Sequence, residues 1–245
     1  MELTEAILTR RSIRAFEPRP VPRRVLQDIM EVALWTPSFA NTQSWEFLMV
    51  GGEKLQELRR KLVEAAISDP EGTPDLPWPG LGDPYGSRRR QVGLKIFAAR
   101  GISREDRDKR EAWRLLGVGL FDAPHAIFIY AEREFGPWAV FDAGAVSLAI
   151  ELAAHERGLG TVPQAAPTRY PQVVHGVLGI PQSKMLILGL AIGYPSLDEP
   201  VNRFPREPMS TDSTWITVRV KGAVDQVVLH AELKTGPRDF VMLDD

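Results

Sequence analysis

The stretch 140-VFDAGAVSLAIELAA-154 decides how the rest of the chain is interpreted. Alanine, valine and leucine occupy nearly every side of a helix with this sequence, which is typical of a helix enclosed at the centre of a domain. The glycines of Gly158-Leu-Gly160 follow directly and favour an end to that helix. The stretch therefore predicts a central buried helix.

Short apolar runs on both sides of this helix predict strands. The runs 45–50, 126–131 and 185–192 are brief and almost wholly apolar, as strands buried in a sheet are. Residues 21–34 and 55–62 have helical spacing instead. Strands and helices alternate through this part of the chain with no change in composition, so we expect a single domain that covers residues 1–210.

Two stretches depart from this alternation. Five prolines and four glycines interrupt residues 70–86, which predicts a long surface loop, either a linker or a lid. A helix is expected from Arg88, and Ser103 is expected to cap another that runs to about Leu116. We expect residues 70–116 to form a loop and helical cover over an active site.

The C-terminal residues, 211–245, differ from the rest. Ile216, Val218 and Val220 alternate with polar residues, and a second β-rich run covers 227–233. This pattern predicts a β-rich hairpin appended to the domain.

Composition and charge exclude several classes of protein. The 245 residues have a net charge of −2, which gives no general attraction to nucleic acid or to an anionic membrane. The chain has no cysteine, so redox chemistry would need a bound cofactor. No start of an export signal is visible, and the run 185–192 is far shorter than the roughly 20 residues that span a bilayer. We therefore expect a cytoplasmic protein that binds neither nucleic acid nor membrane.

The common catalytic and metal-binding motifs are absent from the sequence. It contains no nucleophile elbow, P-loop, zinc-protease helix or EF-hand loop. The four histidines, at positions 125, 155, 175 and 230, lack the spacing of metal ligands. We expect no metal site.

Arg10-Arg11-Ser12-Ile13-Arg14 is the first cluster that could carry chemistry. It places three guanidinium groups and a hydroxyl within five residues, which suits a phosphate or another dianion. The alternative is a basic edge that only faces water.

Two further segments could line a ligand. Residues 37–45 carry five side chains able to hydrogen-bond, next to an aromatic ring at the start of a strand, and could bind the polar edge of a planar heterocycle. Residues 158–166 bring glycine backbone close to whatever lies beside the central helix. The alternatives are an ordinary helix-to-strand loop and a helix cap followed by a short strand.

Taken in this order, these segments resemble the FMN-dependent nitroreductase family. Residues 10–16 match its R-R-S-x-R-x-F element, and residues 37–45 match P-S-x-x-N-x-Q-P-W, with Ser44 in place of the usual proline. The resemblance covers about residues 3–210, and residues 85–106 are similar to the nitrobenzoate reductase-like branch. The other matches are Val21-Pro22 with Leu26, Ala123-Pro124, Asp142-Ala-Gly144, Leu152-Ala-Ala154, Gly158-Leu-Gly160-Thr161, Gly189–Tyr194, Pro200-Val-Asn-Arg203 and Arg206.

The resemblance implies a fold and an assembly. We expect an α+β three-layer sandwich in which helices flank a central mixed sheet, assembled as an intertwined homodimer. Each flavin would lie at the subunit interface and contact both chains. The C-terminal extension would pack on the partner subunit, although an independent binding hairpin is the alternative.

The resemblance also implies roles for particular residues. Arg10, Ser12 and Arg206 would grip the phosphate and ribityl chain of FMN, with Arg11 nearby. Arg14 would face the N1 and O2 edge of the flavin as an electrostatic stabiliser, and the backbone of residues 163–165 would meet N5. No side chain would transfer the hydride itself. The full set of expected cofactor-binding residues is Arg10, Arg11, Ser12, Arg14, Pro37, Ser38, Asn41, Gln43, Pro163, Gln164, Ala165, Arg203 and Arg206.

The activity implied is that of an FMN-dependent oxidoreductase that takes hydride from NADPH or NADH. Its substrates would be small nitroaromatics or quinones, reduced in two-electron steps in alternation with the donor. Two alternatives stay open. One is the same fold with different flavin chemistry, as in a dehalogenase, ene-reductase or dehydrogenase, and the other is a flavin-binding sensor without turnover.

Overall fold

The computed structural model describes residues 1–204, 206, 218–221 and 228–231. The chain divides into two compact units, Met1–Phe204 and Pro205–Asp245. The first unit contains every candidate site residue except Arg206.

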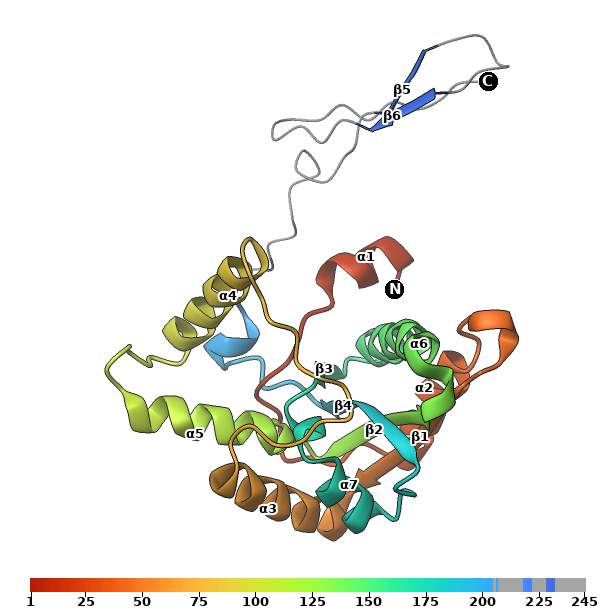
Figure 1. The fold of residues 1–245 in the computed structure, drawn as a ribbon. Coiled ribbons are helices and arrows are strands. Elements are labelled where there is room, and N and C mark those ends of the chain that lie inside the picture. Colours follow the sequence, from red (N-terminus) through yellow and green to blue (C-terminus); the bar gives the residue numbers. More distant parts are fainter. Residues whose placement is uncertain (205, 207–217, 222–227, 232–245) are drawn as a thin grey trace. The chain divides into compact units, whose positions relative to one another are not determined.

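A four-stranded sheet forms the middle of the first unit (Figure 1). Its strand order is β1-β2-β4-β3, and each neighbouring pair is antiparallel. The strands are β1 (Trp45–Gly51), β2 (His125–Glu132), β3 (Gly160–Gln164) and β4 (Lys184–Gly193).

Within the described residues the four-stranded sheet is therefore antiparallel, and not mixed as expected. β2 and β3 run in the same direction, as a helical crossover requires, but β4 lies between them and pairs antiparallel with both. The parallel pairing that is present is a single bridge between Ser12 and Thr161.

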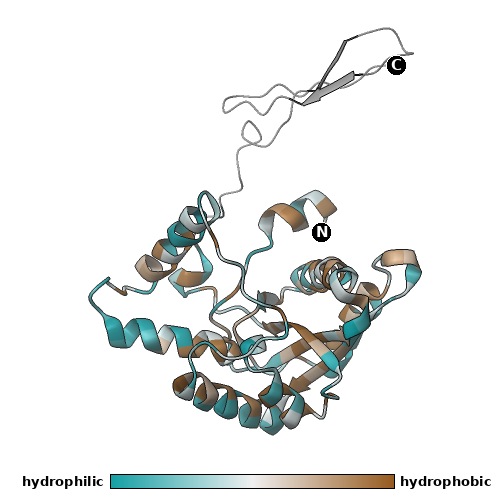
Figure 2. Ribbon diagram, in the orientation of Figure 1, coloured by the Kyte–Doolittle hydropathy of each residue, from teal (hydrophilic) through white to brown (hydrophobic). Residues whose placement is uncertain are grey.

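Helices cover both faces of this sheet, which confirms the three-layer α+β fold. Along β2, Ile127 and Ile129 belong to one core cluster, whereas Ala126 and Phe128 belong to the other. Strand side chains alternate between faces, so the middle of β2, residues 126–129, is apolar because both of its faces are buried. In Figure 2 the strands are accordingly mostly brown. One face packs against α2 (Arg23–Ala33) and α6 (Gly136–Glu156), and the other against α3 (Gly52–Ser68), α5 (Arg107–Val118) and α7 (Pro171–Leu178).

The remaining elements lie around this sandwich. They are α1 (Leu3–Thr9), α4 (Tyr85–Ala99) and five 3-10 turns: η1 (Phe39–Asn41), η2 (Leu120–Asp122), η3 (Arg133–Phe135), η4 (Pro167–Arg169) and η5 (Pro200–Asn202). In the second unit, β5 (Val218–Lys221) pairs antiparallel with β6 (Val228–Ala231), as predicted for the hairpin. Ile216 and the ends of the run 227–233 lie outside the described residues.

The central helix α6 is confirmed and begins earlier than expected, at Gly136. Residues Arg133–Glu156 are long and apolar enough to cross a bilayer by length and composition, but half of that stretch is buried inside the fold, as a core helix would be. Asp142, Ser147 and Glu151 are the buried polar side chains on this helix. Two of them hold the segments from which the candidate site is built.

The predicted cap at Ser103 is wrong. The helix begins at Arg107, because the Ser103 N–H donates to the Asp106 carboxylate (3.0 Å) and the Ser103 hydroxyl accepts from the Glu105 N–H (3.3 Å). These bonds form a separate turn before the helix.

The proline-rich loop between α3 and α4 is fastened at its beginning. Arg169 donates to the Pro70 carbonyl (2.8 Å), and its guanidinium carbon lies 4.4 Å from the centre of the Trp78 ring. The Leu186 N–H donates to the Asp75 carboxylate (2.8 Å). The loop is therefore no linker between domains, and a lid could involve only its part beyond Trp78.

Candidate functional site

The arginine cluster lies on an extended segment beside β3. The Ile13 N–H donates to the Thr161 carbonyl (2.9 Å), and Ser12 forms the parallel bridge to the same residue. Gly160 allows this approach, because a Cβ there would lie 2.5 Å from Cγ1 of Ile13. The segment is thereby held against the sheet edge.

Arg10 is paired with a buried carboxylate of the central helix. Its Nη1 donates to Oε2 of Glu151 over 2.8 Å, and Glu151 is only 5% exposed. A buried carboxylate in so apolar a helix is stabilised by such a partner. The positive charge of Arg10 is therefore partly offset within the chain.

Asn202, at the end of η5, organises the same segment and was missed as a site residue. Its side-chain oxygen accepts the Arg14 N–H (2.8 Å), and its amide donates to the Ala15 carbonyl (2.8 Å). Its own carbonyl accepts from Arg11 Nη1 (3.1 Å). The sequence signal for Asn202 was the matched element Pro200-Val-Asn-Arg203, of which only Arg203 was predicted to bind the cofactor.

Arg14 carries a guanidinium that no carboxylate offsets within the described residues, and unlike the exposed arginines it is partly buried. Its Nη1 donates to the Ser12 carbonyl (3.3 Å), and no carboxylate in the described part of the chain forms an ion pair with it. Burial lowers the pKa of Arg14, because removal from water disfavours the charged form. A partly buried cation of this kind is a place where an electron-rich group would be stabilised.

The second segment, residues 37–45, forms a constrained loop between α2 and β1. The Ser38 hydroxyl accepts the Gln43 N–H (2.9 Å), and the Gln43 amide donates to Oδ1 of Asn41 (3.3 Å). Ala40, Asn41 and Gln43 have φ of 47°, 57° and 47°. Non-glycine residues adopt this left-handed region at an energetic cost, and such residues occur often at binding sites.

Asp142 of α6 anchors that loop. The sequence motif Asp142-Ala-Gly144 contains this residue but did not indicate its role. Its carboxylate is fully buried and accepts the Phe39 N–H (3.0 and 3.3 Å to the two oxygens) and the Ser44 hydroxyl (3.2 Å). The Phe39 ring also stacks on Trp138, with centroids 4.6 Å apart. The strained loop is therefore fixed to the central helix.

The third segment contributes the end of β3. Pro163 is half-buried and Ala165 is exposed. The Gln164 side chain is buried and donates to the Gly117 carbonyl at the end of α5 (2.7 Å). Gln164 therefore ties β3 to α5 through Nε2, while its Oε1 is buried and has no hydrogen-bond partner within the described residues.

The two predicted C-terminal arginines differ in what the structure shows of them. Arg203 donates to the Leu197 carbonyl and pairs with Asp198 (2.8 Å), so its side chain is engaged with its own loop. Arg206 is exposed and belongs to the second unit. Its expected contact with phosphate stays a prediction.

The two halves of the predicted site lie apart within one chain. The arginine segment contacts α6 at Glu151, whereas the loop contacts it at Asp142. These contacts are nine positions apart on α6, which corresponds to about 13 Å along a helix. One copy of the chain therefore does not bring Arg10 and Ser38 to the same place.

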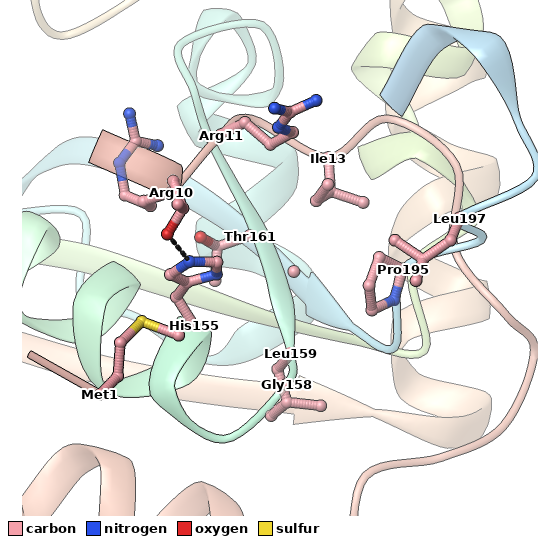
Figure 3. A pocket seen from close by; sticks show the side chains of 12 residues that line it. Met1, Arg10, Arg11, Ile13, His155, Gly158, Leu159, Thr161, Pro195 and Leu197 are labelled. Atoms are coloured by element: carbon pink, nitrogen blue, oxygen red, sulfur yellow. Dashed lines mark hydrogen bonds between the residues drawn. The ribbon is translucent and has the colours of Figure 1, made fainter. Parts of the chain in front are cut away.

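A pocket of about 320 Å³ lies next to Arg10 and Arg11 (Figure 3). Arg10 and His155 lie on one side of it, and Pro195 and Leu197 lie on the opposite side. Burial and the two arginines lower the pKa of His155. Among the described residues there is no group of three metal-ligating side chains. The pocket is lined by Met1, Thr9, Arg10, Arg11, Ile13, His155, Gly158, Leu159, Gly160, Thr161, Pro195 and Leu197.

Comparison with known families decides the classification. Residues 7–194 match the model of the nitroreductase family. The chain belongs to that family. The resemblance proposed from the sequence motifs is therefore confirmed.

Individual nitroreductases agree with this assignment. A 4-nitrobenzoate reductase of Nocardioides sp. (strain LMS-CY) is 30% identical over 228 residues, which cover 88% of this chain and 91% of the relative. The crystal structure of an FMN- and NADPH-dependent nitroreductase, NfnB from sphigopyxis sp. strain HMH, has a TM-score of 0.85 at 34% identity and covers 88% of this chain and 98% of that one. The FMN-dependent nitroreductase NfnB from Mycobacterium smegmatis, solved in complex with NADPH, has a TM-score of 0.78 at 28% identity, with coverage of 84% and 93%.

Proposed function

We propose that this nitroreductase-family protein is an FMN-dependent oxidoreductase that transfers hydride from NADPH or NADH to small nitroaromatics or quinones. The observation that carries the proposal is Arg14, a partly buried guanidinium with no carboxylate paired to it in the described part of the chain. Such a charge stabilises an electron-rich partner, and the chain itself carries no redox-active side chain of the cysteine type. A bound flavin supplies both the redox chemistry and the electron-rich edge.

The residues present fit FMN. Arg10, Arg11 and Ser12 would hold the phosphate and ribityl chain, with Arg203 and Arg206 from the C-terminal side. Pro37, Ser38, Asn41 and Gln43 would line the ring system, and the backbone of Pro163, Gln164 and Ala165 would contact the reactive edge. FMN held there would supply hydride transfer between the nicotinamide and the substrate. Arg14 would stabilise the negative charge that reduction places on the flavin, and the other residues would bind and orient it.

A homodimer is part of the proposal. The loop 37–45 and the arginine segment contact α6 about 13 Å apart, and we propose that the loop of a second copy completes the site around the arginine segment. Large apolar side chains near these segments are exposed, among them Leu8 (70%), Trp35 (90%) and Phe141 (69%). A second copy would cover them. The C-terminal extension is proposed to pack on the partner subunit, and the cytoplasm is proposed as the compartment.

Steady-state turnover tests the activity. Protein saturated with FMN is expected to oxidise NADPH only when 4-nitrobenzoate or menadione is present, with parallel double-reciprocal plots because donor and acceptor alternate at one flavin. An FMN-saturated protein that oxidises neither NADPH nor NADH with any of these acceptors contradicts the proposed reaction. FMN binding without turnover would favour the sensor.

A further inference from the structure

Positive charge is concentrated on the two helices that follow the proline-rich loop. Residues 85–118, which comprise α4, α5 and the turn between them, carry ten basic and four acidic residues, a net charge of +6, although the whole chain has a net charge of −2. A surface of this sign attracts anionic ligands. The basic residues are Arg88, Arg89, Arg90, Lys95, Arg100, Arg104, Arg107, Lys109, Arg110 and Arg114.

Some of these basic residues form ion pairs with nearby carboxylates. On α5, Glu111 pairs with Arg114 (2.7 Å), and Asp106 lies 3.4 Å from Lys109. At the C-terminal end of α4, Arg100 pairs with Glu199 just before η5 (2.8 Å). The charges of these arginines and of Lys109 are therefore partly offset by neighbouring carboxylates.

Arg89 lies on the inner face of α4 and has no such partner. It shares one helical stripe with Gly93, Ile96 and Arg100, at intervals of four, seven and eleven residues. Ile96 is buried and Arg100 contacts Glu199, so this stripe faces the body of the fold. Two turns before Ile96, the Arg89 side chain is exposed, and the structure gives it no ion pair or hydrogen bond within the described residues.

The position of α4 connects Arg89 with the candidate site. α4 lies beside η5 (Figure 1), and the two elements are in contact. η5 ends with Asn202, which holds the backbone of Arg14. α4 is therefore in contact with the element that holds the segment carrying Arg10–Arg14.

We infer that Arg89 is a specificity-determining residue that binds the oxyanion group of an aromatic substrate entering this site. The inference rests on the proposed function. The shared chemistry is an oxyanion group, a phosphate or a carboxylate, which a guanidinium binds in a bidentate way. The group is either the 2′-phosphate that distinguishes NADPH from NADH or the carboxylate that distinguishes 4-nitrobenzoate from 4-nitrotoluene.

Two matched pairs of substrates test Arg89→Gln in the FMN-loaded full-length protein. NADPH and NADH are compared with menadione as acceptor, and 4-nitrobenzoate and 4-nitrotoluene are compared with the donor that the wild-type protein uses better. We expect kcat/KM for the anionic member of at least one pair to fall about tenfold, whereas the neutral member changes less than about twofold. The pair that responds identifies the phosphate or the carboxylate. FMN affinity should stay that of the wild-type protein.

Arg88→Gln is the control, because it removes the same charge from the next residue of α4. Arg88 points to a different side of the helix, where its guanidinium lies over the Tyr85 ring at 5.8 Å. Equal losses in both variants, or unchanged ratios in Arg89→Gln, overturn the inference while the proposed function stands. A wild-type protein that binds FMN but oxidises neither donor overturns both.

Discussion

The Asp142→Ala variant is expected to lose about 2 to 4 kcal/mol of unfolding free energy and most of its FMN affinity. The Asp142 carboxylate is fully buried, and its removal leaves the Phe39 N–H and the Ser44 hydroxyl without their acceptor. It also releases a loop in which Ala40, Asn41 and Gln43 are held in the left-handed region. Such strain persists only while its surroundings impose it.

Denaturant unfolding and flavin fluorescence titration measure the two effects separately. Ser44→Ala is the matched control, because it removes one 3.2 Å hydrogen bond to the same carboxylate and leaves the bonds from Phe39 in place. Its cost should be about 1 kcal/mol, with FMN affinity nearly retained. An Asp142→Ala protein as stable as the wild type would show that the carboxylate does not fix the loop.

Arg14→Leu is expected to keep FMN but to lower the flavin midpoint potential and slow reduction by NADPH. Negative charge appears on the flavin only upon reduction, so the loss of a nearby cation penalises the reduced state more than the oxidised one. The change should be on the order of 1 to 3 kcal/mol, which corresponds to roughly 20 to 60 mV for a two-electron couple.

Spectroelectrochemistry of Arg14→Leu checks this directly. Arg24→Leu is the control for the change in net charge, since Arg24 is an exposed residue of α2 paired with Asp28. Its potential should equal that of the wild type. A wild-type potential in Arg14→Leu, or complete loss of flavin, would place Arg14 in the phosphate cluster or in a surface pair.

Much of the layered fold could be predicted because it depends on local patterns. The all-round apolar segment 140–154 became α6, and the three apolar runs became β1, β2 and β4. The mixed sheet was expected from the family resemblance, and the sequence could not correct it because strand order is a long-range property. The pattern of apolar residues within each strand does not reveal that β4 lies between β2 and β3.

The candidate site was predicted less completely, for a related reason. The motifs located the arginine segment and the loop, but not the residues that hold them. Asp142 and Phe39 are 103 positions apart in the sequence, and Arg10 and Glu151 are 141 apart. A carboxylate in an apolar helix indicates that a partner exists without saying which one. Asn202 was likewise visible only once η5 was seen beside the segment 11–15.

The flavin content of the purified protein tests the central claim most directly. We expect a yellow protein that releases FMN and not FAD on heating, with one flavin per chain, since each chain carries one arginine–serine cluster and no dinucleotide-binding fingerprint. A protein that lost its flavin during purification should take up added FMN at micromolar concentration and recover the same stoichiometry. A colourless protein that takes up no FMN under these conditions would contradict the account.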